Sequence, residues 1–240
     1  PLAEAAKFVN ADAGFTEAQA CLDGARDILS EQWAEDAALV GKLREWLWTN
    51  GLFESKVAEG KEKDGDKFRD YFDYAEPIGK VPSHRALAVF RGWLAEVLTV
   101  KLVQPEANVP VRPERSEGSH STSNPSPAGS GRTVTPFSVC EGMVANQVQW
   151  SHQARAADDW LKRVVSWTWK VKLAPALERD LFARLREGAE EVAIRVFGDN
   201  VRELLLAAPA GNKVVMGLDP GIRTGVKVAV VDATGKVVAT

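Results

Sequence analysis

The spacing of apolar residues changes at Lys213, and this change limits the folds that the chain can adopt. Before Lys213, apolar residues such as Leu22, Leu29 and Trp33 recur at helical spacing, which places them on one face of a helix. After it, the runs "VVMGLD", "VKVAVVD" and "KVVAT" are separated by "PGIRTG" and "ATG", a pattern typical of antiparallel strands joined by tight turns. The first of these runs is expected to form a buried strand. The sequence therefore predicts a mainly α protein, with a multi-helical N-terminal body followed by antiparallel strands.

Two helical stretches are predicted in the first fifty residues. Residues 16–19 have the form of a capping box, so a helix should begin near Glu17. A second apolar stripe runs up to Asn50 and Gly51, which are typical helix-ending residues. Residues 17–50 are therefore expected to form one kinked helix or two short ones.

Residues 57–103 mix turn residues with short periodic runs. The charged stretch 57–68 predicts an exposed loop. Because Pro77 and Pro82 disfavour helix before them, we expect a short helix ending near Glu76, a turn, and a new helix capped by Ser83. Residues 96–103 alternate in strand fashion and give the only strand expected in this half.

The later helices are predicted from apolar spacing, with breaks at proline and glycine. Pro175 is expected to stop or restart a helix, and Gly198 with Asp199 to break the next one. The apolar face before Pro175 is expected to contain Trp160, Val164, Trp167 and Val171; the face after it, Leu177, Leu181, Leu185, Val192 and Val196.

The segment 104–137 interrupts this helical pattern. It holds six of the twelve prolines, together with many serines and glycines, and has too little apolar surface to offset the entropy of ordering. We expect a disordered insertion there. The predicted organisation is a helical region at 1–103, the insertion at 104–137, a helical continuation at 138–212 and a sheet domain starting at 213–240.

Charge and composition exclude several classes of protein. The formal net charge of −3 does not attract phosphates, so a nucleic-acid contact requires a local basic patch. No uncharged apolar run reaches the roughly 18 residues that a membrane helix requires, and two distant cysteines fit a reducing, cytoplasmic setting. Because the chain begins with Pro1 and ends within a predicted strand, we expect it to be an excerpt of a longer protein.

Five sequence blocks identify a resemblance. The blocks "KFRDYFDYAEPIGKVPSHRALAVFRG", "CEGMVANQ", "WTWKVKL", "LLLAAPAG" and "GLDPGIRTGVKVAVVDATGKV" occur in the order found in the bacterial transcription accessory protein (Tex) family, which the chain resembles over most of its length. The insertion and the apolar pair Trp93 and Leu94 depart from the family pattern.

The resemblance implies a helical region followed by a YqgF (RuvC-like) domain, an α/β ribonuclease H-like fold whose first antiparallel strands begin near residue 213. It also implies helix-hairpin-helix modules and an S1-type RNA-binding barrel beyond residue 240. Family members are understood as nucleic-acid-binding factors in transcription, and their YqgF domain is thought to lack an intact nuclease centre.

Asp219 is the candidate metal ligand, since it ends the first predicted strand of that domain. Two-metal phosphoryl transfer requires several clustered carboxylates, whereas residues 213–240 supply one candidate, Asp219. The alternative is that Asp219 caps the following turn by accepting amide hydrogen bonds. We therefore assign no catalytic residue and expect no cofactor and no enzymatic activity.

Two sets of basic residues are candidate nucleic-acid contacts. Arg223 and Lys227 flank the turn after Asp219, and Lys80, Arg85 and Arg91 lie around a proline-bounded corner. The nearby Asp70, Asp73 and Glu76 favour ion pairs within the chain instead. Of the eight tryptophans, Trp48 and Trp150 have polar neighbours and are the ones considered for base stacking.

These observations predict a non-catalytic scaffold within a nucleic-acid-binding transcription factor, which contacts RNA or DNA mainly through regions beyond residue 240. Two alternatives remain open at this point: the start of a metal-dependent nuclease domain, and a protein-interaction module that docks on the transcription machinery. Neither alternative implies a membrane partner.

Overall fold

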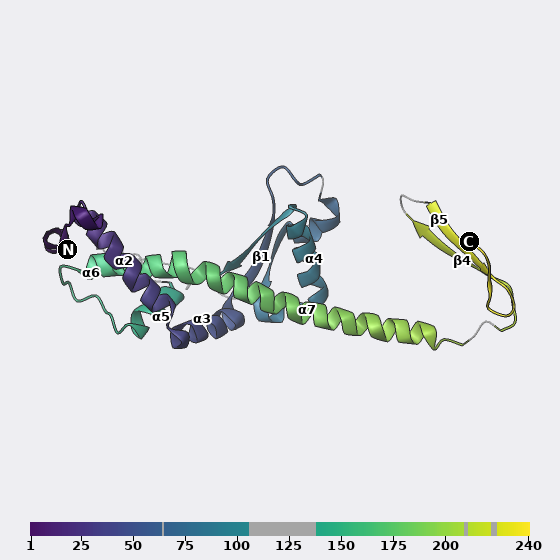
Figure 1. Cartoon of the computed structure of the whole chain (residues 1–240). Helices are drawn as coiled ribbons and strands as arrows, with labels where there is room; N and C mark the ends of the chain where they lie inside the picture. The colour runs from purple at the N-terminus through teal and green to yellow at the C-terminus, as the bar shows by residue number, and fades with distance from the viewer. Residues whose placement is uncertain (64, 106–137, 209–210, 222–224) are drawn as a thin grey trace, which may run out of the picture. The chain divides into compact units, whose positions relative to one another are not determined.

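The computed structural model describes residues 1–63, 65–105, 138–208, 211–221 and 225–240. These residues divide into two compact units, Pro1–Val192 and Ala193–Thr240, each described by itself below (Figure 1). Most of the predicted insertion, residues 106–137, lies outside the described residues.

The first unit begins with short helical turns and two longer helices. The turns are α1 (Leu2–Ala5), η1 (Ala6–Phe8) and η2 (Ala11–Ala13), and the longer helices are α2 (Ala18–Ala34) and α3 (Ala37–Asn50). Asp36 separates the longer two, because its carboxylate accepts hydrogen bonds from the N–H groups of Ala38 and Leu39 and so starts α3. The predicted capping box at 16–19 is not formed: Glu17 is the N-cap of α2 and makes no side-chain capping bond.

A three-stranded antiparallel sheet follows, where the sequence predicted one strand. It consists of β1 (Leu52–Val57), β2 (Asp73–Pro77) and β3 (Leu98–Val103), in the order β2-β1-β3. The expected helix ending near Glu76 was wrong, since a 3₁₀ turn, η3 (Asp66–Tyr71), precedes β2. Cross-strand pairing with β1 overrides the local helical pattern, as strand propensity depends strongly on context.

One face of this sheet is buried and the other faces solvent. Phe53 on the central strand β1 is fully buried. Its ring centroid lies 5.4 Å from those of both Phe90 of α4 (Ser83–Leu94) and Phe182 of α7 (Ala174–Leu205). Figure 1 shows α4 and α7 beside the strands. Helix α4 follows η4 (Ile78–Lys80) and is preceded by Pro82, so Ser83 is its first residue and not its cap.

A long helical run closes the first unit. After α5 (Val139–Gln147), which begins with a capping box between Ser138 and Glu141, α6 (Asp158–Trp167) continues through a π-helix, η5 (Thr168–Leu173), into α7 (Ala174–Leu205). Of the two outcomes predicted at Pro175, a stop or a restart, the structure shows a restart, since α7 begins at Ala174. Proline lacks an N–H, but here it lies in the first turn of α7, just after the π-helix, where the regular α hydrogen-bond pattern is already altered.

The π-helix also changes which residues face the core. Trp167 and Val171, predicted to face inward, are 38% and 46% exposed, whereas Trp169 and Leu173 are buried. The wider π turn shifts the helical phase from Thr168 onward, so Val171, extrapolated from Val164 at α-helical spacing, points outward. Trp167 lies before the π-helix, and its ring contacts the Arg26 guanidinium, whose Cζ atom is 4.0 Å from the ring centroid. The predicted break at Gly198 and Asp199 was also wrong, because a long helix tolerates the cost of about 1 kcal/mol of one interior glycine.

Helix α3, helix α7 and the sheet share the core of the first unit. The residues predicted to face inward from α3, among them Leu43, are fully buried or nearly so, as are Leu177, Leu181 and Leu185 of α7. Val192 and Val196, predicted for the same face, are 41% and 52% exposed.

The corner at Gly79 is in backbone contact with α3. A Cβ atom at this position would lie 2.7 Å from the carbonyl oxygen of Trp48 and 3.1 Å from its Nε1 atom. The other side of the Trp48 ring carries Arg184, whose Cζ atom is 4.1 Å from a ring centroid. Trp48 is thus engaged within the first unit.

The second unit contains the end of α7 and a small sheet. Its strands are β4 (Val215–Gly221), β5 (Gly225–Val231) and β6 (Val237–Ala239), antiparallel in the order β4-β5-β6, which confirms the three predicted strands. The first strand was expected to be buried but is exposed along its length, because no described element covers it. Its side chains include Met216 and Leu218, each 62% exposed.

No described helix is both long and apolar enough to cross a membrane.

Candidate nucleic-acid interface

The predicted metal ligand Asp219 lies on β4, directly opposite Lys227 on β5. The Nζ atom of Lys227 is 3.9 Å from Oδ2 of Asp219, and both side chains are about four-fifths exposed, at 82% and 78%. An ion pair this exposed contributes little free energy. Arg223 and the amides of residues 222–224 lie outside the described residues, so the turn-capping role of Asp219 stays a prediction.

The charged group described next to Asp219 is a cation. Among the residues that the structure describes, no three His, Cys, Asp or Glu side chains gather as a metal site. The charged group beside Asp219 is instead the ammonium of Lys227. Metal-assisted phosphoryl transfer needs several carboxylates around the ions, so no chemical step can be built on this carboxylate alone.

The basic corner of the first unit is partly used by internal contacts. Arg85 forms an ion pair with Glu76, which also accepts a hydrogen bond of 2.7 Å from the hydroxyl of Tyr74. Burial, with the adjacent Glu76 carboxylate, raises the pKa of Tyr74. The expected ion pairing is thus observed for Arg85, while Lys80 and Arg91 are exposed.

Trp150 is held by a buried carboxylate that the sequence did not reveal. Its indole Nε1 donates to Asp158 Oδ1 at 3.2 Å, and the Asp158 side chain also accepts from the backbone N–H groups of Gln153 and Arg155 and from the Arg155 guanidinium. These donors, Arg155 first, lower the pKa of Asp158. Trp150 therefore serves local structure, like Trp48, and neither ring is a free stacking platform.

The cysteines do not suggest nucleophilic chemistry. Cys140 is fully buried, and burial, with the charge of Glu141, raises the pKa of its thiol to about 12. A thiol that stays protonated is a poor nucleophile.

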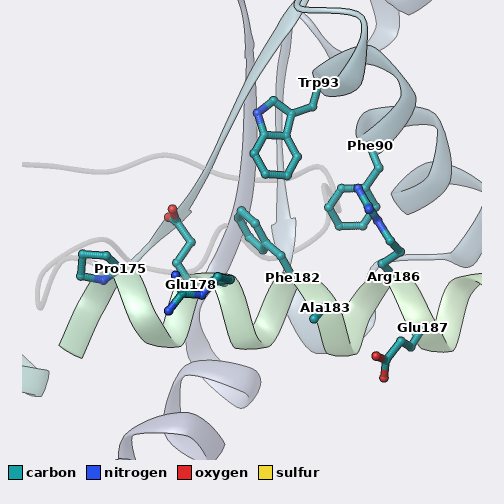
Figure 2. A pocket seen from close by; sticks show the side chains of 9 residues that line it. Phe90, Trp93, Pro175, Glu178, Phe182, Ala183, Arg186 and Glu187 are labelled. Carbon is teal, nitrogen blue, oxygen red and sulfur yellow. The ribbon is translucent and has the colours of Figure 1, made fainter. Parts of the chain in front are cut away.

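One hollow of the first unit lies between α4 and α7, and none of its lining residues is among the predicted site residues. It is an open groove of about 500 Å³, in which Trp93 and Phe182 face each other (Figure 2). Their ring centroids are 6.0 Å apart at 77°, and Trp93 remains 42% exposed. The one sequence signal was the position of Trp93, where the family pattern favours a polar residue.

Comparison with known proteins identifies both parts of the chain. Residues 1–197 match the family described as Tex central region-like, and residues 213–240 match the Tex protein YqgF-like domain. The chain belongs to the Tex family. A helical body followed by the start of a YqgF-like domain is therefore confirmed as its fold.

Several known proteins resemble the chain along most of its length. Protein tex of Bordetella pertussis is 49% identical over all of this chain, which covers 28% of that protein. The Transcriptional accessory protein Tex of Neisseria gonorrhoeae is 43% identical over 93% of this chain and 26% of its own length. The S1 RNA-binding domain-containing protein 1 of Pongo abelii is 27% identical over 90% of this chain and 20% of its own length. The chain thus spans little more than a quarter of the Bordetella relative.

Proposed function

We propose that this chain is part of a cytoplasmic, nucleic-acid-binding transcription accessory factor, in which it acts as a non-catalytic scaffold. Membership of the Tex family supports the role in transcription, as does the name of the Neisseria relative. The name of the Pongo relative supports RNA as a ligand of the larger assembly.

The observation that carries the scaffold proposal is the pairing of Asp219 with Lys227. In a ribonuclease H-like nuclease, the carboxylate at the end of the first strand binds the catalytic cations together with other acidic residues. Here the charged group described next to Asp219 is the Lys227 ammonium and not a second carboxylate. The domain keeps the strands of such a fold and supplies a support for other parts of the factor.

The charge of the chain supports weak nucleic-acid binding by these 240 residues. The formal net charge is −3, and the candidate Arg85 is already paired with Glu76. Few phosphates would be neutralised, so few counterions would be released. Strong binding is expected to require regions of the kind that the relatives carry beyond the matched segment.

The test is a titration of fluorescein-labelled single-stranded RNA with the 240-residue chain and, in parallel, with the full-length Bordetella relative. We expect weak binding by the former and tight binding by the latter. Submicromolar, salt-sensitive binding by the 240-residue chain would contradict the proposal, because it would place the strong RNA-binding activity within these residues.

The absence of nuclease activity is tested by incubating branched and single-stranded nucleic acids with Mg²⁺ and either the full-length Bordetella relative or the 240-residue chain. We expect no cleavage. The nuclease alternative would be established if this chain cleaved a substrate and Asp219→Asn abolished the cleavage. The control substitution Asp199→Asn, on the exposed part of α7, should then leave the cleavage unchanged.

A further inference from the structure

The groove between α4 and α7 combines an aromatic wall with an open volume. Trp93, Phe90 and Phe182 form this wall, with ring centroids 6.0 to 6.3 Å apart. Two smaller hollows lie next to it: one shares the lining residues Pro175 and Glu178 with it, and the other shares Phe90 and Arg186.

The edge of the sheet at β3 contacts α7 through Glu178, a residue that also lines the groove. In the order β2-β1-β3, strand β3 pairs with β1 on one side, and its other edge carries no described strand. On that edge the N–H of Leu102 donates to the Glu178 carboxylate at 2.8 Å. Glu178 thus takes the acceptor position that a carbonyl of an added strand would occupy, which prevents a continuous ladder from forming at this point.

A buried acceptor near this edge has no donor. Gln104 follows β3, and its Oε1 atom is buried without a hydrogen-bond partner. Gln104 is one of the residues that line the hollow of about 190 Å³ next to the groove, and a buried acceptor without a donor is unfavourable for the fold.

Two arginines on α7 complete the groove. Arg186 lies with its Cζ atom 4.8 Å from the Phe90 ring centroid, and Arg179 lines the same hollow. Neither has a carboxylate partner among the residues the structure describes. Arginine and tryptophan are the residues most enriched at the energetic centres of protein interfaces.

We propose that this groove binds a short peptide segment of a partner protein. The segment packs an apolar side chain against the exposed part of Trp93 and sets a carboxylate beside Arg179 and Arg186. A polypeptide carries both groups within a few residues of one another.

The charges of the groove favour a peptide over a nucleic acid. Glu178 and Glu187 line it together with the two arginines, so its formal charges cancel and it has no field that attracts a phosphate chain. Non-polar centres with mixed charges around them are typical of protein interfaces. The groove is lined by residues other than Asp219 and Lys227. A negative result in the peptide-binding test would therefore leave the scaffold proposal unaffected.

Selection from a phage-displayed library of random peptides on the 240-residue chain tests the proposal, with counter-selection on the Trp93→Ser variant. Enriched sequences are expected to share an apolar residue next to Asp or Glu. Fluorescence anisotropy of one labelled peptide then gives the affinity. Arg179→Glu and Arg186→Glu should each weaken it about 30-fold, as expected for a contact worth about 2 kcal/mol.

Arg163→Glu is the matched control, because Arg163 is an exposed arginine on α6 outside the groove, and it should leave the affinity unchanged. Thermal melting of each variant separates lost binding from lost folding. The substitutions of Arg179 and Arg186 keep the test valid if Trp93→Ser does not fold.

Three results would overturn the proposal: no peptide is enriched, the enriched peptides share basic residues, or Arg163→Glu weakens binding as much as the groove substitutions do. Binding of labelled single-stranded RNA that the Arg179 and Arg186 variants abolish would overturn it in favour of a nucleic-acid groove.

Discussion

Glu178 and Leu102 connect the long helix to the sheet through one hydrogen bond, in which a carboxylate oxygen accepts the backbone N–H at 2.8 Å. The bond joins α7 to a strand far away in the sequence. It also satisfies a donor at the sheet edge that would otherwise lose its bond to water when the helix packs over it.

Substitution of Glu178 by Ala is expected to lower the free energy of unfolding by about 1–2 kcal/mol, because the Leu102 N–H loses its acceptor. Glu178→Gln should cost less, since the amide oxygen still accepts. Urea denaturation followed by circular dichroism measures both. Glu187→Ala, on the same helix, is the control and should change stability little; equal losses for the two alanine variants would contradict the role of the hydrogen bond.

The buried carboxylate of Asp158 is expected to make stability depend on pH in the acid range. Hydrogen bonding, first from Arg155, lowers its folded-state pKa below the ordinary value of 3.8. A carboxyl with a lowered pKa stabilises the fold above its unfolded pKa, and this stability is lost as pH falls toward the folded pKa. Stability should therefore decrease as pH is lowered below about 4.

Asp158→Asn is expected to reduce this acid dependence and to lower stability at neutral pH, where the charged acceptor is lost. Urea denaturation at a series of pH values from neutral to acid provides the measurement. Asp159→Asn is a suitable control, since the Asp159 side chain is 93% exposed. An unchanged pH slope in Asp158→Asn would show that other carboxylates account for acid unfolding.

Truncation of the core of α3 should be strongly destabilising. Leu43 is completely buried in the cluster shared with α7 and the sheet, so Leu43→Ala is expected to cost about 3 kcal/mol through lost burial and the cavity left behind. Leu94→Ala is the matched control, because Leu94 is 79% exposed at the end of α4. It should lower the free energy of unfolding by well under 1 kcal/mol. Similar melting temperatures for the two variants would rule out the assigned core.

Removal of residues 105–136 is expected to leave the first unit folded. The buried cluster is made by residues on either side of this stretch, from Leu39 to Val100 and from Cys140 to Ala189. Differential scanning calorimetry of the deletion variant should retain a cooperative transition. A broad, non-cooperative melt would mean that the deleted residues contribute to the core.

The elements predicted correctly are those whose own residues carry the periodic signal. The α3 stripe containing Leu43 and the strand pattern around Val228 needed no information from distant residues. The strands β1 and β2 were missed because their stability comes from pairing with each other and with β3. The π-helix was missed because its phase shift depends on how Trp169 and Leu173 pack against other helices.

In the candidate site, too, contacts between residues close in sequence were predictable, whereas contacts made by tertiary packing were not. The pairing of Arg85 was foreseeable, because acidic residues are close to it in the sequence. The groove was not, because its two aromatic faces, Trp93 and Phe182, are brought together by the packing of α7 against the sheet. The carboxylate around which residues 150–158 are arranged carries no sequence signal beyond an aspartate at the start of a helix.

The close approach of Gly79 to Trp48 also restricts how this part of the chain can vary. Every side chain larger than hydrogen at position 79 would collide with the main chain of α3, at 2.7 Å from a carbonyl oxygen that cannot rotate away. Gly41, whose added Cβ would meet nothing within 4 Å, is free of this constraint. Substitutions should therefore accumulate readily at Gly41 among functional variants of this chain, while position 79 admits none without a compensating displacement of the helix.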